Sequence, residues 1–283
     1  MLLEGKNILI TGASMGIGLA VAEACAAQGA SLILVSRHEA DLAKVIEMLR
    51  GNGQTHTYRC VDVGSADAVE KMAVSLTERL ESLDGVVNCA GVYGPIGSTD
   101  IVDVGEFATT IQINLLGTFY VCHYLLPLLK KASRGKIVNY SGGGAAGPFP
   151  NYCAYSVSKV GIVRLTENMA LELKADGIDV NSVAPGFVVT RLHEQTLEAG
   201  AKAGEAFLQK TKEQIASGGV SADIAAKLTV FLLSPESDGI TGKFISAPWD
   251  FWQDKAFQDR LRKEPDFAAL RRIDGRQFVG TKP

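Results

Sequence analysis

The stretch Asn7-Ile-Leu-Ile-Thr-Gly-Ala-Ser-Met-Gly-Ile-Gly18 joins a short apolar run to a segment whose apolar residues have helical spacing. Its glycines follow the pattern G-x-x-x-G-x-G at this junction. Such glycines let backbone N–H groups approach a pyrophosphate, and the N-terminus of the next helix favours the negative charge of that group. We therefore predict a strand–loop–helix unit that binds a dinucleotide. The predicted contacts are Gly12, Ser14, Met15, Gly16, Ile17 and Gly18.

Short β-branched apolar runs alternate with longer helical patterns on either side of this loop and through most of the chain. Continuously apolar strands separated by helices indicate a parallel sheet that is covered on both faces. We predict an α/β fold with a single Rossmann-type, doubly wound parallel sheet. The predicted strands are 7–11, 31–35, 57–61, 85–88, 136–140, 179–183 and 244–246, and the predicted helices are 17–27, 39–50, 66–83, 107–131, 155–174 and 222–233.

The bulk composition is that of an ordinary globular protein. The 283 residues are 47% hydrophobic and 21% charged, and the net charge of −3 gives no global attraction to nucleic acid or acidic membranes. We find neither the pattern of a signal peptide nor an uninterrupted apolar stretch of about 18–20 residues. The five cysteines and four histidines are scattered and form no CxxC pair. We expect a cytoplasmic protein with no metal, nucleic-acid or membrane partner.

The alternating pattern predicts one dinucleotide-binding catalytic domain over residues 1–246. Within it, residues 191–220 form a long polar connection, which is either a lid over the substrate or a surface helical excursion. Residues 247–283 form an extension rich in aromatic and charged residues, which we expect to dock against the domain or a neighbouring subunit. Its cluster Arg271-Arg272-Ile-Asp274 either reaches an anionic substrate group or forms surface ion pairs.

The residues after the second predicted strand indicate which cofactor the loop holds. An acidic residue at this place binds the ribose 2′-hydroxyl of NAD and repels a 2′-phosphate. Here the strand is followed by Ser36-Arg37-His38, and the first carboxylate is Glu39. A hydroxyl and a guanidinium fit a phosphate, so NADP(H) is preferred, with NAD(H) possible. Arg37 stacking on the adenine is the alternative. Asp62 and Val63 are predicted to reach the adenine, although Asp62 equally suits a helix cap.

Tyr155-Ser-Val-Ser-Lys159 carries a phenol and an ammonium four residues apart, at the start of a predicted helix. Side chains at this spacing project from one helical face. A free tyrosine has a pKa of about 10 and is a poor base at neutral pH. A nearby cation favours the phenolate, and we therefore expect Lys159 to lower the pKa of Tyr155 towards the working pH.

Five motifs together resemble the short-chain dehydrogenase/reductase family over roughly residues 4–246. The first is the glycine loop, and the fourth is the Tyr155–Lys159 pair. The second, third and fifth are Asn88-Cys-Ala-Gly91, Ile113-Asn114-Leu-Leu-Gly117 and Pro185-Gly186-Phe-Val-Val-Thr190. The resemblance implies an NAD(P)-dependent oxidoreductase that transfers a hydride between a nicotinamide cofactor and a carbonyl or secondary alcohol.

The resemblance also implies a role for each matching residue. Tyr155 exchanges a proton with the substrate oxygen, and Lys159 lowers its pKa and holds the nicotinamide ribose. Asn114 positions water and Lys159 in a proton relay. The implied cofactor contacts beyond the glycine loop are Asn88, Ala90, Gly91, Tyr155, Lys159, Val183, Pro185, Gly186, Val188 and Thr190.

One position departs from the family's pattern. Similar family members carry a substrate-polarising serine 13 residues before the tyrosine, and here that residue is Gly142. Ser141 lies one residue earlier, and the following glycines give the loop freedom to reorient. We expect Ser141 to supply the polarising hydroxyl. The alternative is a turn serine that caps backbone groups.

The substrate is less well specified than the chemistry. The pattern resembles 3-oxoacyl-carrier-protein reductases, so a 3-oxoacyl thioester is the nominal substrate, and a sugar or nucleotide sugar is the alternative. A dinucleotide-binding regulator with impaired catalysis is a further alternative, motivated by Gly142. We expect aromatic residues and the 191–220 segment to surround the pocket, namely Tyr93, Pro95, Phe149, Tyr152 and Phe187.

Two surfaces suggest macromolecular contacts. Lys130, Lys131, Arg134 and Lys136 form either a patch for an acidic carrier protein or a solvated helix end that offsets the helix dipole. The helices at 107–131 and 155–174 resemble those through which family members pair, so we expect a homotetramer or a homodimer.

Overall fold

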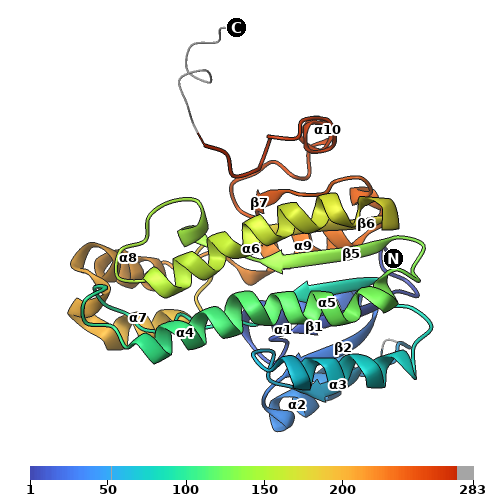
Figure 1. Cartoon of the computed structure of the whole chain (residues 1–283), viewed down its shortest axis with the longest axis horizontal. Coiled ribbons are helices and arrows are strands. Elements are labelled where there is room, and N and C mark those ends of the chain that lie inside the picture. The colour runs from blue at the N-terminus through green and yellow to red at the C-terminus, as the bar shows by residue number, and fades with distance from the viewer. Residues whose placement is uncertain (52, 273–283) are drawn as a thin grey trace, which may run out of the picture.

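A seven-stranded parallel sheet with the order β3-β2-β1-β4-β5-β6-β7 forms the centre of the computed structural model, which describes residues 1–51 and 53–272 (Figure 1). Each neighbouring pair of strands is parallel, and β1 pairs with both β2 and β4. This arrangement confirms the predicted doubly wound α/β fold. The strands are β1 (Asn7–Thr11), β2 (Ser31–Ser36), β3 (Thr57–Cys60), β4 (Gly85–Asn88), β5 (Gly135–Tyr140), β6 (Ile178–Ala184) and β7 (Phe244–Ser246).

Helices cover both faces of the sheet. Figure 1 shows α5 and α6 side by side in front of it, with α3 beside α5 and with α1 and α9 behind the strands. The helices are α1 (Gly16–Ala27), α2 (Glu39–Leu49), α3 (Ala66–Thr77), α4 (Val104–Ile111), α5 (Gly117–Leu129), α6 (Cys153–Glu172), α7 (Arg191–Ala199), α8 (Glu205–Ala216), α9 (Ala222–Leu233) and α10 (Lys255–Lys263).

Strand β1 shows why the fold needs a helical layer on each side. Ile8 and Ile10 belong to the core cluster under α1 and α9, whereas Leu9 belongs to the cluster under α3 and α5. All three side chains are fully buried. Successive strand residues point to opposite faces, so a strand of consecutive apolar residues is stable only when both faces are covered.

Two predicted helices differ most from those observed, while those at 17–27, 39–50 and 155–174 shift by one or two residues at their ends. The helix expected at 66–83 ends at Thr77. The residues after it form a connection to Asp84, whose carboxylate accepts the Lys6 ammonium and the Asn7 N–H at the start of β1. The helix expected at 107–131 begins at Val104 and contains a π-helical turn, η1 (Gln112–Leu116). Such turns occur frequently at functional sites. This turn carries Asn114, which is fully buried.

The stretch Val104–Leu129 is, among the described residues, the one helical stretch long and apolar enough to cross a membrane, with a mean hydropathy of 1.2. In this fold it lies along the sheet, and its α5 part packs against α3, β4 and β5. Buried core helices of globular domains meet the same length and hydropathy criteria. The packing accounts for part of its apolar character, since 39% of the most apolar window is buried in the described structure.

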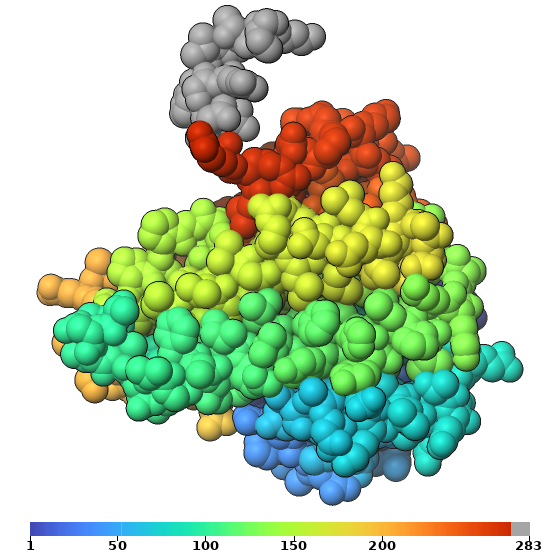
Figure 2. All heavy atoms as spheres, in the orientation of Figure 1, coloured from blue at the N-terminus to red at the C-terminus, as the bar shows by residue number. Residues whose placement is uncertain are grey.

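Residues 247–272 of the extension dock on the domain itself. Figures 1 and 2 show this segment, with α10, lying over β7 and α6. Trp252 and Leu261 enter the core cluster, and the Phe244 N–H donates to the carbonyl of Ala268 at 2.7 Å. The Lys243 ammonium donates to three backbone carbonyls just beyond α10. The open edge of β7 is thus partly covered by the chain's own extension.

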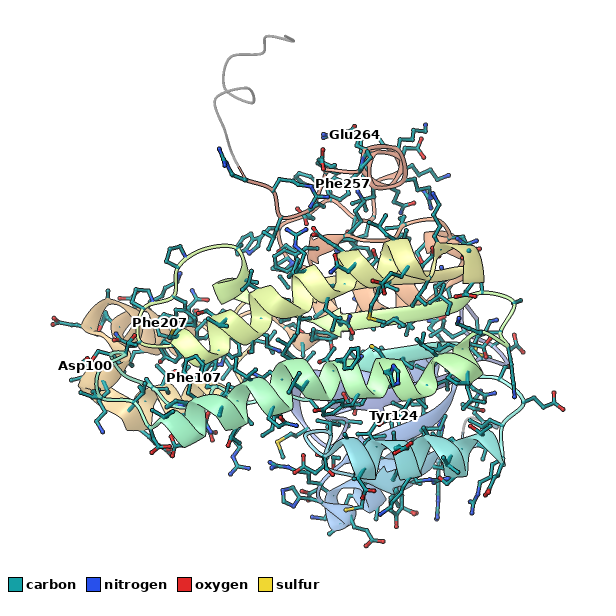
Figure 3. All side chains as sticks on the ribbon, in the orientation of Figure 1. Asp100, Phe107, Tyr124, Phe207, Phe257 and Glu264 are labelled. Carbon is teal, nitrogen blue, oxygen red and sulfur yellow. The ribbon has the colours of Figure 1, made fainter. Side chains whose placement is uncertain are left out.

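The charged end of this segment forms ion pairs. Arg271 donates to Glu167 on α6 at 2.9 Å and also pairs with Asp266, while the N–H of Leu270 donates to Glu167. Arg271 therefore forms ion pairs at the surface, which is the second of the two roles predicted for its cluster. Asp274 lies outside the described residues. In Figure 3, Phe257 and Glu264 mark this segment on the outer side of α6.

Candidate active site

The glycine loop between β1 and α1 is built around close backbone approaches. Gly12 and Gly16 have positive φ angles of 64° and 55°, which favour glycine. A Cβ on Gly18 would lie 2.2 Å from the Gly12 carbonyl oxygen, and one on Gly12 would lie 2.9 Å from Ala90. The Thr11 hydroxyl accepts the N–H groups of Cys89 and Ala90, which ties this loop to the end of β4. No larger residue fits at Gly12 or Gly18 without a backbone shift.

A cleft of about 530 Å³ opens beside this loop, at the carboxyl ends of the strands, where ligands bind in open α/β sheets. Most of the predicted cofactor contacts line it. These are Gly12, Ser14, Met15, Gly16, Ile17, Gly18, Ser36, Arg37, Asp62, Val63, Ala90, Gly91 and Thr190.

Several predicted contacts lie elsewhere. The side-chain amide of Asn88 donates to Asn139 on β5 at 2.9 Å, so it joins two strands and does not line the cleft. Gly186 packs against Pro248 and has a φ of 81°. Five more predicted contacts are absent from the described lining of the cleft, namely Tyr155, Lys159, Val183, Pro185 and Val188.

The cleft also contains residues that the sequence did not reveal. Arg191, Leu192 and Gln195 reach it from α7, and no local pattern around them signals a nucleotide contact. The other unpredicted residues of the cleft lie at strand ends or next to the predicted motifs. This position in the sequence could have indicated a contact with the cofactor. These residues are Val35, His38, Val61, Cys89, Val92 and Ile113.

Asn114 holds the loop after β4 against α6. Its Oδ1 accepts the Val92 N–H at 2.8 Å, and its Nδ2 donates to the Val92 carbonyl and to the Ser158 hydroxyl, both at 2.9 Å. A Cβ on Gly91 would lie 3.2 Å from the Asn114 Oδ1 and 3.4 Å from the Lys159 Nζ. The absence of a side chain at Gly91 thus leaves room for the asparagine and the lysine on the same side of the loop, and the relay through Asn114 stays a prediction.

Burial dominates the electrostatics of the catalytic pair. The Lys159 Nζ lies 5.6 Å from the centre of the Tyr155 ring and donates to the Tyr140 carbonyl at 2.9 Å. Loss of solvent lowers the pKa of Lys159 to about 8 and raises the pKa of Tyr155 to about 12. The predicted lowering of the tyrosine pKa is therefore not found in this structure. The phenol carries its proton at neutral pH, as a proton donor for carbonyl reduction must.

The structure does not support the polarising role predicted for Ser141. Its hydroxyl is buried and donates to the backbone carbonyl of Lys159 at 3.0 Å. The residue that faces the tyrosine is Gly142, since a Cβ built there would lie 2.6 Å from the Tyr155 hydroxyl. Adjacent residues in an extended chain point to opposite sides, and Gly142 has φ −178° and ψ 179°. The serine consequently holds helix α6 rather than the substrate.

An aromatic cluster lies next to Tyr155. The ring of Tyr93 meets those of Tyr155 and Tyr152 edge to face, with centroids 4.8 Å and 5.3 Å apart. Phe149 stacks on Tyr152, and Phe207 of α8, labelled in Figure 3, packs against both. Helices α7 and α8 are thereby packed on the substrate side of the site. This position fits the lid interpretation of residues 191–220.

The basic residues predicted as a possible carrier-protein patch are mostly neutralised. Lys136 is buried and pairs with Asp179 and Asp238. Arg134 makes a two-pronged hydrogen bond to Asp179, and Lys130 pairs with Asp176. The cluster therefore ties β5 to β6 and the helix ends, and three of its four cations are engaged.

His193 gives a pH-dependent prediction of stability. It is 8% exposed, lies 3.9 Å from Phe187 between ring centroids, and burial lowers its pKa from 6.5 to about 4. The unfolded chain therefore binds a proton between pH 6.5 and 4 that the folded chain does not. This contribution to stability is complete above pH 6.5 and is lost as the pH falls towards 4.

We expect the wild type to lose about 2 kcal/mol more than His193→Asn between pH 7 and pH 5, measured by urea unfolding. The Asn oxygen replaces the ring nitrogen that accepts the Thr190 N–H. His123→Asn, at an exposed position on α5, is the matched control and should behave as the wild type. Equal pH dependence in wild type and His193→Asn would contradict the buried neutral histidine.

The glycine cradle, the cleft at the strand ends and the tyrosine–lysine–asparagine group define a Rossmann-type oxidoreductase that uses a nicotinamide dinucleotide. A profile of the family described as short chain dehydrogenase matches residues 6–200. The chain belongs to the short-chain dehydrogenase/reductase family, and it is an enzyme that acts on alcohol or carbonyl substrates with NAD(P).

Named relatives cover almost the whole chain. It is 32% identical over 261 residues to levodione reductase from Leifsonia aquatica, covering 89% of this chain and 95% of the relative. It is 31% identical over 247 residues to D-beta-hydroxybutyrate dehydrogenase from Cupriavidus necator, covering 85% and 95%. The crystal structure of NAD⁺-bound xylitol dehydrogenase superposes with a TM-score of 0.81 at 27% identity, covering 87% of this chain and 98% of that one.

Proposed function

We propose that the chain is an NADP(H)-preferring reductase of ketones, or dehydrogenase of the corresponding secondary alcohols. The observation that carries this proposal is the Tyr155 hydroxyl, which belongs to a half-buried ring beside Lys159 and faces the bare backbone of Gly142. When bound, the nicotinamide ring supplies or accepts the hydride. Tyr155 gives its proton to the substrate oxygen in reduction, and the Lys159 ammonium stabilises the phenolate that remains.

Lys159 is itself held for this role. Its Nζ donates to the Tyr140 carbonyl, and its own backbone carbonyl accepts the Ser141 hydroxyl. Asn114 binds both backbone groups of Val92 and the Ser158 hydroxyl, which fixes the loop after β4 relative to α6. These contacts fix the lysine and the loop that flank the acid. A regulator without catalysis is disfavoured, because such a protein needs no acid–ammonium pair.

The preference for NADP(H) rests on the end of β2. Ser36 and Arg37 line the cleft, and Ser36 accepts the His38 N–H in a tight turn. The nearest carboxylate along the chain, Glu39, accepts the hydroxyl of Tyr58 at 3.0 Å. A guanidinium at this place attracts the 2′-phosphate that distinguishes NADP from NAD.

We expect Arg37→Ala to raise the Kd for NADPH about 10-fold to 100-fold and to leave the Kd for NADH unchanged within about twofold. A hydrogen bond to a charged group contributes about 1.5–3 kcal/mol, which corresponds to that range. Fluorescence titration of the bound nucleotide measures both constants. Arg50→Ala removes an exposed charge that pairs with Glu47 at the end of α2 and is the control. Equal losses for both cofactors would contradict the 2′-phosphate contact.

The aromatic cluster favours a ketone with a compact apolar body. Tyr93, Phe149 and Phe187 present ring surface near Tyr155 or the lid, and three of the four lysines and arginines of the predicted carrier-protein patch are engaged in ion pairs. The relatives include a levodione reductase, a D-beta-hydroxybutyrate dehydrogenase and a D-threitol dehydrogenase. A 3-oxoacyl thioester, a sugar and a nucleotide sugar stay predictions to be tested.

NADPH oxidation and NADP⁺ reduction should be followed with cyclic diones, acyl thioesters, sugars and their alcohols. We expect turnover with a cyclic or small ketone. Binding of NADPH without turnover across this panel would contradict the proposed function and support the regulator.

A cytoplasmic location and a homotetramer or homodimer also stay predictions. Large apolar side chains on the outer surface of α5 and α6 support an association, since exposed apolar surface of this kind commonly marks an interface. Light scattering on the purified protein measures the oligomeric state. The side chains are Phe119, Val157, Val160 and Leu171, which are 39–78% exposed.

A further inference from the structure

The side chain that faces the Tyr155 hydroxyl from the end of β5 is missing, because residue 142 is glycine. A carbonyl oxygen that receives a hydride on its carbon develops negative charge, and a fixed donor besides the proton-giving acid stabilises that charge. The chain must supply this donor from elsewhere, or use the acid alone. The hydroxyl groups that surround Tyr155 are the candidates for such a donor.

Most of these hydroxyls are already committed. Ser141 donates to the Lys159 carbonyl, and Ser158 donates to the Tyr155 carbonyl while accepting from Asn114. The Tyr152 hydroxyl donates to Thr196 on α7 at 2.9 Å. None of the three is free to bind a substrate oxygen without breaking a contact that shapes the site.

Tyr93 differs from these residues. The residue is 5% exposed and its phenol makes no hydrogen bond within residues 1–51 and 53–272, yet its oxygen is not among the fully enclosed polar atoms that lack a partner there. Its ring lies edge to face against Tyr155 with centroids 4.8 Å apart and planes at 87°. A tyrosine hydroxyl that is neither fully enclosed nor held by a partner, at the edge of a packed aromatic cluster, is available to a ligand.

Tyr93 is also rigidly placed. Its neighbour Val92 is bound by Asn114 through both its N–H and its carbonyl. The Tyr93 ring is flanked by Tyr152 at 5.3 Å and by His193 at 6.0 Å, both edge to face. A donor held by packing in this way needs little reorganisation when charge develops on the substrate.

We infer that the phenol of Tyr93 donates a second hydrogen bond to the substrate oxygen and takes the place of the side chain that Gly142 lacks. This inference rests on the proposed ketone–alcohol chemistry. In reduction the carbonyl π bond breaks, the carbon gains the hydride of NADPH, and the oxygen gains the proton of Tyr155. Tyr93 keeps its own proton throughout.

The electrostatics of the pair agree with this division of roles. Burial, and the charge that Tyr155 acquires, raise the pKa of Tyr93 well above its ordinary value. Lys159 lies beside the ring of Tyr155, and no lysine lies beside the ring of Tyr93 in the part of the chain that the structure describes. Tyr93 therefore stays a neutral donor at working pH. Tyr155, beside Lys159, gives its proton to the substrate oxygen, and Tyr93 stabilises the negative charge that develops on that oxygen.

The test is Tyr93→Phe, assayed with the ketone of the panel that the wild type reduces best. We expect kcat to fall about 10²-fold, with the melting temperature and the Kd for NADPH unchanged. The primary isotope effect on kcat with 4-deuterated NADPH should rise, because hydride transfer becomes more rate-limiting. Tyr124→Phe, on α5 and remote from α7 and α8 in Figure 3, is the matched control and should keep the wild-type kcat.

Ser141→Ala separates the two possible donors, and we expect its kcat to fall less than that of Tyr93→Phe. The reverse order, an unchanged kcat in Tyr93→Phe, or a loss that comes with an equal loss of NADPH affinity would each overturn the inference. In all three cases wild-type turnover leaves the proposed function standing. A wild type that reduces nothing in the panel overturns the proposed function, and this inference with it.

Discussion

Tyr155→Phe is expected to lower kcat/KM for ketone reduction about 10³-fold while the protein still folds and binds NADPH. The variant removes the one group that gives a proton to the substrate oxygen, and general acid catalysis contributes about 10²–10⁴-fold. Folding should be preserved, because the Tyr155 hydroxyl makes no hydrogen bond within the part of the chain that the structure describes, while its ring keeps its contacts with Tyr93 and Phe149.

Steady-state kinetics and nucleotide titration check this expectation together. Tyr120→Phe, a tyrosine on α5 whose hydroxyl accepts from Gln112, removes the same atom away from the cluster and is the control. A Tyr155→Phe enzyme that keeps more than a tenth of the wild-type kcat/KM would show that another group supplies the proton.

Gly142→Ser is expected to lower kcat/KM about 10²-fold, although it restores the serine that similar family members carry. The Cβ of residue 142 would lie 2.6 Å from the Tyr155 hydroxyl, so the phenol must move away. A misplacement of about 1 Å in a catalytic group can cost about 10²-fold in rate. The backbone itself is not the obstacle, because Gly142 has an extended conformation that any residue adopts.

Gly143→Ser is the matched control for this variant. A Cβ on Gly143 meets nothing within 4 Å, so the same side chain enters open space one residue later. We expect Gly143→Ser to keep kcat/KM within about threefold of the wild type. If Gly142→Ser is as active as the wild type or more so, the tyrosine yields at low cost and the glycine is not required by the position of the phenol.

The results for Gly142→Ser and Gly143→Ser would show how this site differs from that of family members with a serine at the position of Gly142. In this chain the tyrosine occupies space beside bare backbone, and Ser141 faces away to hold the Lys159 carbonyl. Whether residue 141 or residue 142 faces the Tyr155 hydroxyl depends on the direction in which each of them points. Successive residues at the end of β5 point to alternate sides of the sheet. Which of them points to the tyrosine depends on how the strand is placed in the folded sheet.

Much of the fold was predictable because its signals are local. The strands at 7–11, 85–88 and 244–246 have the predicted bounds. Their apolar runs are short and bounded by glycine or polar residues, which few other conformations satisfy. The helix predicted at 107–131 was less accurate, because helical periodicity does not reveal the π-helical turn that turns Asn114 inward.

The catalytic pair and the glycine loop are, by themselves, properties of the sequence. Residues four apart on a helix share a face wherever the helix lies, and a loop with glycines between a strand and a helix presents its N–H groups in any such fold. Even so, the four-residue spacing did not reveal whether the pKa of Tyr155 is raised or lowered. Burial of the phenol outweighs the nearby ammonium, and burial is a property of the packed site.

Only the tertiary structure brings distant segments to this site. Tyr93 follows β4 and His193 lies on α7, yet both rings join Tyr155 in one cluster. Arg191 reaches the cofactor cleft from α7, and Arg271 of the extension pairs with Glu167 on α6. These contacts join residues separated by tens of positions or more, so no local periodicity encodes them. Local chemistry thus determined the strands, the loop and the reacting pair, whereas packing between distant segments decided which hydroxyls are free to meet a substrate.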